Sequence, residues 1–159
     1  DTSPPPLTID PIPAELELEL PPIPKPGGTY SPIVQVGNLV FVSGHGPLQS
    51  DGTMIQGKVG LDLTLEEGNT AAKVVGLTML STLKAQLGSL DRIHRWVKVL
   101  GMVNATPEFD KHPQVINGFS DLMVSLYGQN GKAARSAVGM GSLPGNISVE
   151  VEAIIELKD

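Results

Sequence analysis

Arg135 and Glu150 are the pair of residues in this chain whose types and spacing point most directly to chemistry. Arg135 heads the small, apolar run ARSAVGM, and Glu150 follows fifteen residues later in SVEVEAIIEL. A guanidinium presents a planar fork of donors that matches a carboxylate, and a glutamate carboxylate can position or deprotonate a water. Together they would suit a small carboxylic acid that is hydrolysed at the adjacent carbon. A plain surface ion pair explains the same spacing, so the spacing alone leaves both alternatives open.

Two closing strands, predicted at 134–141 and 147–157, must position this pair. We predict that they form a hairpin around Leu143-Pro144, in the register that sets apolar residues opposite apolar residues. A slip by one residue would mismatch the two faces, which is a strong penalty for a half-buried sheet. In the favoured register, Arg135 lies diagonally across from Glu150 on one face, so the two side chains can converge on one small molecule.

Local signals place the other elements. Thr64 and Glu67 have the spacing of a capping box, and Gly88 supplies a helix stop. This pattern predicts an α+β fold, in which a mixed sheet carries both helices on one face. A second subunit is the simplest cover for the other face. The expected elements are a strand pair within 32–44 that turns at Gly37-Asn38, a short strand at 53–59, a helix from Thr64 to Gly88, a strand at 92–104, a helix from Pro113 to Gly128, and the two closing strands.

Residues 1–29 differ from the rest because they hold most of the prolines. Proline cannot donate to a sheet or sit inside a helix. We therefore interpret 1–29 as an extended arm, laid against the body or a neighbouring subunit, and 30–159 as the folded domain. For residues 1–14 a flexible tail is an equally open alternative, whereas AELELEL alternates like a short edge strand. The chain begins with Asp1 rather than Met, which indicates that something upstream was removed.

Length and composition exclude several classes of protein. A chain of 159 residues can bury the core of one domain. The formal net charge of −6 and the lack of a Lys/Arg cluster argue against a nucleic-acid partner. We expect no membrane span, because no apolar run is long enough, and the absence of cysteine fits a reducing, cytoplasmic location. His45, His94 and His112 lack the spacing of metal ligands, so no metal site is expected.

Three stretches resemble one known family. NLVFVSGHGP, LDRI with VKVLGMV, and above all ARSAVGMGSLPGNISVEVEAI resemble the RidA/YjgF family of reactive intermediate deaminases, from about Gly28 to Leu157. The resemblance implies a chorismate-mutase-like α+β fold and a homotrimer with sites between subunits. It also implies hydrolysis of reactive enamines and imines, such as 2-aminoacrylate and 2-iminopropionate, to 2-keto acids and ammonia. Neither a metal nor an organic cofactor is implied.

The resemblance also assigns roles to individual residues. Arg135 matches the family arginine that grips the substrate carboxylate, and Glu150 matches the glutamate that holds the attacking water. The remaining matches are Tyr30, which would reach into the neighbouring subunit's site, Gly44, whose backbone would lie near the ligand, Ser43, which precedes it, and Asn117, near the start of the second helix.

This chain departs from the family pattern at several positions. His45 stands where many members have glutamine, which places it beside the site as a candidate substrate contact. Ala137 stands where a cysteine is common, and the segment between Phe109 and Asn117 is longer than usual. These departures and the proline-rich arm indicate a divergent branch of the superfamily.

Two alternatives remain open at this stage. A non-catalytic trimer that binds small keto acids would use the same arginine and would not need Glu150 chemistry. An endoribonuclease, a name attached to this family, is the less favoured alternative because the chain is acidic and lacks a paired histidine acid and base.

Overall fold

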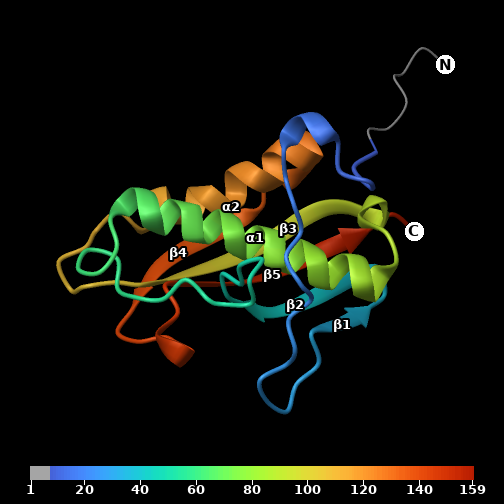
Figure 1. Ribbon diagram of the computed structural model, residues 1–159. Coiled ribbons are helices and arrows are strands. Elements are labelled where there is room, and N and C mark those ends of the chain that lie inside the picture. Colours follow the sequence, from blue (N-terminus) through green and yellow to red (C-terminus); the bar gives the residue numbers. More distant parts are fainter. Residues whose placement is uncertain (1–7) are drawn as a thin grey trace.

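The computed structural model describes residues 8–159 and shows a mixed five-stranded sheet with two helices packed on one face (Figure 1). The predicted α+β architecture is therefore confirmed. Within the described residues, no helix is long and apolar enough to cross a membrane. The elements are β1 (Ile33–Val36), β2 (Leu39–His45), α1 (Leu65–Leu87), β3 (Ile93–Asn104), α2 (His112–Tyr127), β4 (Ala134–Met140) and β5 (Val149–Leu157).

The strand order corrects the predicted closing hairpin. The sheet runs β1-β2-β5-β3-β4, so β3 lies between β4 and β5, and β4 pairs with β3 in parallel. β5 occupies the centre because every second residue from Val149 to Leu157 is apolar and buried. β4 carries small, largely exposed residues that suit an edge. The predicted strand at 53–59 is likewise wrong, since this segment makes only isolated bridges.

Both helices begin and end where the sequence predicts. The Thr64 hydroxyl accepts the Glu67 N–H at 3.1 Å, and the Glu67 carboxylate accepts the Thr64 N–H at 3.0 Å, which completes the capping box of α1. Gly88 ends this helix with a φ of 86°, a conformation that favours glycine. In α2, Pro113 lies in the first turn, where its missing N–H costs no helical hydrogen bond.

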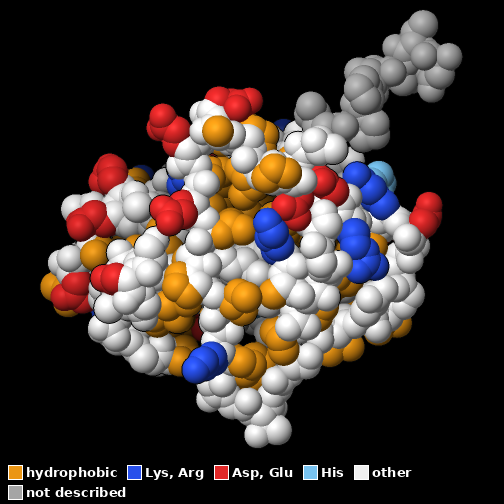
Figure 2. Space-filling view, turned by 45° about the vertical axis from the view of Figure 1, so that its right-hand side comes forward, with side chains coloured by type: hydrophobic (Ala, Val, Ile, Leu, Met, Phe, Trp, Pro, Cys, Tyr) orange, Lys and Arg blue, Asp and Glu red, His pale blue; other side chains and the backbone are white. Residues whose placement is uncertain are grey.

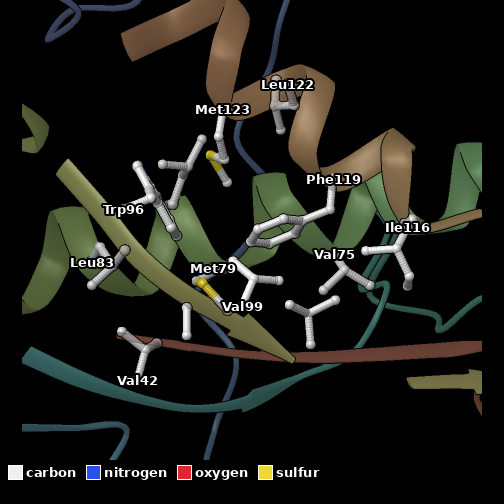
Figure 3. Close-up of a cluster of buried hydrophobic side chains, with 14 of the residues drawn as sticks. Val42, Val75, Met79, Leu83, Trp96, Val99, Ile116, Phe119, Leu122 and Met123 are labelled. Atoms are coloured by element: carbon white, nitrogen blue, oxygen red, sulfur yellow. The ribbon is translucent and has the colours of Figure 1, made fainter. Parts of the chain in front are cut away.

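The core lies between the helices and one face of the sheet. Trp96 of β3 packs edge-on against Phe119 of α2, with the ring centroids 5.7 Å apart. Figure 3 shows both rings between α2 and the sheet, with Met79 and Leu83 of α1 beside them. This continuous layer makes the sheet a rigid platform for residues at its ends and on its other face.

The opposite face of the sheet carries an exposed apolar patch. The β1–β2 register sets Val34 against Phe41 and Val36 against Leu39, and all four side chains are exposed by 37 to 61 %. Val138 of β4 lies on the same face and is 38 % exposed. An apolar patch of this kind is typical of an interaction surface. The predicted cover by a second subunit stays a prediction.

The described part of the arm, residues 8–29, packs against the body. Ile9 is buried in the core, and the Asp10 carboxylate accepts the Lys84 ammonium at 2.9 Å and the Leu90 N–H at 3.0 Å. Further on, the Ser81 hydroxyl donates to the Pro21 carbonyl at 2.6 Å. Figure 2 shows hydrophobic side chains along the side of the molecule that the arm crosses. The arm is therefore part of the folded structure from residue 8 onward; residues 1–7 lie outside the described part.

The alternation in AELELEL has a cause other than the predicted edge strand. A short 3₁₀ turn covers Ala14–Leu16, and the segment after it joins no sheet. The leucines pack against the core while the glutamates point to solvent. Period-two alternation here reflects an extended chain lying on a surface, so the strand prediction was wrong.

Asp10→Ala is expected to lower the free energy of unfolding by about 1–3 kcal/mol, because the Leu90 N–H loses a charged acceptor. Hydrogen bonding from Lys84 lowers the pKa of Asp10 below its ordinary value of 3.8. Its contribution is therefore complete above about pH 3.8 and falls as the pH drops through the lower pKa. Urea unfolding at neutral and acid pH measures this. Glu19→Ala, an exposed change in the same arm, is the control and should leave the free energy unchanged.

Candidate functional site

A cavity of about 750 Å³ opens beside the start of β5. We call it the Glu150 cavity. Its size falls in the range typical of small-molecule sites. Among the described residues, no cluster of three potential ligands could hold a metal ion. The lining consists of residues 24–27, Tyr30 and Pro32 of the arm and the segment after it, 43–46 at the end of β2, Met54 and Gln56, Thr82 of α1, the loop residues Pro144, Gly145 and Ile147, and Glu150 and Glu152 of β5.

Glu150 is one of the titratable groups in this lining. Its side chain is partly buried, and burial raises the pKa of the carboxyl, with a further rise from the charge of Glu152. Gly44 makes room for it, since a Cβ on Gly44 would overlap the Glu150 Oε2 atom. The pairing of β2 with β5 therefore brings these two residues together. A carboxylate with a raised pKa is a stronger base than an ordinary glutamate, which suits it to accept a proton.

A β-bulge at the end of β2 presents the backbone of Ser43 and Gly44 to the cavity. The β2–β5 register shifts between Val42 and His45, and such bulges redirect the chain next to functional sites. The Ser43 hydroxyl donates to the Ser31 carbonyl at 2.6 Å, and the Ser43 N–H donates to the Pro32 carbonyl at 3.0 Å. These bonds fix the bulge to the segment that follows the arm.

His45 holds this bulge in place from beneath. Its Nδ1 lies 2.6 Å from the Ser43 carbonyl, and its Nε2 lies 2.8 Å from the Thr82 hydroxyl. Burial lowers the pKa of the imidazole, so the ring is neutral at neutral pH. A neutral ring that donates from Nδ1 and accepts at Nε2 satisfies both bonds. Because both nitrogens are hydrogen-bonded within the protein, His45 positions the bulge. It also belongs to the cavity lining, and its candidate role as a substrate contact stays a prediction.

Tyr30 lines the cavity of its own chain. The side chain is 50 % exposed, and its hydroxyl accepts the Gly27 N–H at 3.2 Å. The bond closes a short turn, so the tyrosine ring and the end of the arm form one continuous wall.

Arg135 and Asn117 do not line the Glu150 cavity of their own chain. Arg135 pairs with Val99, whose side chain faces the helices, whereas Glu150 pairs with Met102 on the opposite face. The predicted side-by-side placement of Arg135 and Glu150 is therefore wrong within one chain. The physical reason is the insertion of β3 between the two strands.

The guanidinium of Arg135 is held by α2 instead. Its Nη1 donates to the Asn117 amide oxygen at 2.8 Å and to the Ser120 hydroxyl at 3.1 Å. We call these three residues the Arg135 cluster. Ser120 was missed from the sequence, although its i+3 spacing from Asn117 puts both on one helix face. Both bonds use one nitrogen, so the remaining fork of donors is suited to a carboxylate.

A second group missed from the sequence holds the loop between β4 and β5. The Lys58 ammonium donates to the Asn104 amide oxygen at 2.9 Å and to the Gly141 carbonyl at 2.7 Å. Asn104 is fully buried and donates to Asn146 and to the Ile147 carbonyl, both at 3.1 Å. These bonds fix the loop that forms one side of the Glu150 cavity.

Gly44→Ala is expected to lower turnover at this site by about 10²-fold, because the added methyl displaces the Glu150 carboxyl by roughly an ångström. Steady-state kinetics with the substrate proposed below measures the loss. Gly141→Ala adds the same methyl outside this lining, at a point where no heavy atom lies within 4 Å. That control should keep its activity, and an active Gly44→Ala enzyme would contradict the placement of Glu150.

Comparisons with known proteins agree with this architecture. The family model described as "YjgF/chorismate_mutase-like, putative endoribonuclease" matches residues 13–157. Protein TCP17 of Trypanosoma cruzi is 39 % identical over 145 residues, which cover 91 % of each chain. The crystal structure of Atu1372 from Agrobacterium tumefaciens, described as a protein of unknown function, is 40 % identical, with a TM-score of 0.83 over 91 % of this chain and 90 % of that one. A 2-iminobutanoate/2-iminopropanoate deaminase of Dermatophagoides farinae is 27 % identical over 85 % of this chain and 91 % of its own.

Proposed function

Since this chain belongs to the YjgF/chorismate-mutase-like family, we propose that it hydrolyses small reactive enamines and imines, of the 2-aminoacrylate and 2-iminopropionate type, to 2-keto acids and ammonia. The observation that carries the proposal is the partly buried Glu150 carboxylate, whose raised pKa suits proton transfer and which faces the bulge at Gly44 inside a cavity. A relative named as an imine deaminase supports the same activity. We propose that the enzyme acts in the cytoplasm without a metal or organic cofactor.

The reaction needs one base that later acts as an acid. A water oxygen adds to C2 of the iminium, while the Glu150 carboxylate accepts a proton from that water, and a tetrahedral carbinolamine forms. The protonated Glu150 then returns the proton to the amine nitrogen. The C–N bond breaks and its electron pair leaves with ammonia, while the hydroxyl oxygen forms the keto group and its proton passes to the released ammonia. Iminium and water thus become 2-keto acid and ammonium.

Arg135 is the proposed partner for the substrate carboxylate. We propose that it reaches the Glu150 cavity of a neighbouring subunit in a homotrimer, because the two residues lie on opposite faces of the sheet within one chain. The exposed apolar sheet face and the position of Arg135 on the edge strand β4 support such packing. Backbone N–H groups near Gly44 would steady charge that develops on the substrate.

Turnover of freshly generated 2-iminopropionate tests the proposal. Release of pyruvate and ammonia above the spontaneous rate is the expected result, and a rate equal to that of buffer would refute it. RNA cleavage is less favoured because the chain carries a net charge of −6. Contacts to phosphate weaken steeply as the salt concentration rises. An RNA affinity that does not change with salt concentration would therefore count against the endoribonuclease alternative.

Glu152→Gln is expected to shift the acid limb of the pH profile of kcat/KM to lower pH. Activity needs ionised Glu150, so it falls as the pH drops below the raised pKa of that group. Removing the neighbouring negative charge makes ionisation easier and lowers this pKa. Glu156→Gln, on the same face but at the far end of β5, where Glu156 pairs with Arg95 at 3.0 Å, is the control. Its acid limb should not move, and an unmoved limb in Glu152→Gln would contradict the role of Glu150 as base.

A further inference from the structure

The arm forms one wall of the Glu150 cavity. Residues 24–27 belong to its lining, and Met54 and Ile147 contribute apolar side chains from the rest of the lining. The last two approach each other around Gly46, where a Cβ would lie 3.0 Å from Ile147 and 3.3 Å from the Met54 sulfur. The lining thus combines polar residues, among them Lys25, Ser43 and the β5 glutamates, with apolar side chains from the prolines of the arm, Met54 and Ile147.

The cavity as a whole is larger than a three-carbon imino acid requires. Cavities of roughly 300–1,000 Å³ hold drug-sized ligands, and this one measures about 750 Å³. An arginine that enters from a neighbour to hold the substrate carboxylate must lie near Glu150, because the reacting carbon is bonded to that carboxylate. The space beside Pro24, Pro26, Met54 and Ile147 is then left for the substrate's side chain.

Two consecutive residues of α1 fix the arm relative to the reacting groups. Ser81 holds the Pro21 carbonyl, three residues before the wall begins, and Thr82 holds His45 beneath the bulge. Both side chains are buried. Proline restricts the backbone before and after the contact with Ser81, so the wall is stiff. One turn of one helix therefore sets the distance between the arm and the Glu150 carboxyl.

We propose that residues 24–27 contact the substrate's side chain, and that this enzyme prefers imino acids with a bulky apolar side chain to the three-carbon imine. The inference rests on the proposed function and adds a substrate class to it. The arm is accordingly a specificity-determining part of the site.

Gly27→Phe tests the inference by filling the part of the cavity that lies beside residues 24–27. Gly27 lines the cavity, and a Cβ there would meet no heavy atom within 4 Å. The imines are generated from leucine and from alanine with an amino-acid oxidase, and semicarbazide serves as a competing trap. The wild type should show the higher kcat/KM on the leucine-derived imine. Gly27→Phe should lower that value by about tenfold or more and change the alanine-derived value by less than about twofold.

Ile23→Phe is the matched control, because Ile23 lies in the same segment, is 59 % exposed and is not part of the lining. It should leave both values unchanged. Gly27→Val is a milder second variant, with a smaller loss in the same direction, in case the phenylalanine disturbs folding. If the wild type hydrolyses neither imine, the proposed function itself fails. If the wild type prefers the alanine-derived imine, the substrate preference is overturned. If Gly27 variants lower both values equally, the proposed contact of residues 24–27 with the side chain is overturned, and in both cases the deaminase activity stands.

Discussion

Glu150→Gln is expected to lower kcat for 2-iminopropionate hydrolysis by about 10²–10⁴-fold, the usual contribution of a positioned general base. Glutamine keeps the size and hydrogen-bonding capacity of the side chain but cannot accept the proton of the attacking water. The fold should be unaffected, because burial already disfavours the charged form of this carboxyl. Initial rates of pyruvate and ammonia release, corrected for spontaneous hydrolysis, measure the loss.

Two controls make this result specific. Glu156→Gln is the same substitution on the same strand, near its end, and should keep full activity. Calorimetric titration with a small keto acid should show that Glu150→Gln still binds, since Arg135 is the proposed partner of the substrate carboxylate. A variant that retains both binding and wild-type turnover would remove Glu150 from the mechanism. A wild type that binds keto acids without any turnover would instead favour the non-catalytic binding protein.

The helices could be predicted from the sequence because their signals are local. The capping box at Thr64 and Glu67, the stop at Gly88 and Pro113 in a first turn each act within a few residues. The order of the strands could not be predicted in this way. Strands that follow each other in the sequence usually pair, which favoured a closing hairpin. The wholly apolar inner face of β5 is instead best buried at the centre of the sheet. The loop after β4 therefore crosses the end of β3.

In the candidate site, too, some residues could be predicted from the sequence and others could not. Glu150 and Gly44 follow from the resemblance, and the sheet register brings them together. The residues that support them have partners far away in the sequence: His45 bonds Thr82 across 37 positions, and Ser81 bonds Pro21 across 60. Neither bond has a local signature. That His45 is buried between two hydrogen-bonding oxygen atoms could not be predicted without the fold.

Mixed trimers of Arg135→Ala and Glu150→Gln subunits are expected to recover about one quarter of wild-type activity, although each variant alone is inactive. In the proposed homotrimer, each site would take its arginine from one subunit and its glutamate from the next. In a random equimolar mixture, about half of the subunits supply an intact arginine, and about half of their neighbours supply an intact glutamate. Co-refolding or co-expression, followed by light scattering and the imine assay, measures the recovery.

The recovery depends on which chain supplies each group. If both groups acted from one chain, every subunit in the mixture would carry a defect, and the mixture would be as inactive as its parents. The sheet geometry argues for the shared site, because β3 separates the two strands and the two side chains leave opposite faces. Mixing Arg135→Ala with Glu156→Gln is the matched control. It should recover about half of the activity, because every subunit keeps Glu150 and only the arginine is diluted.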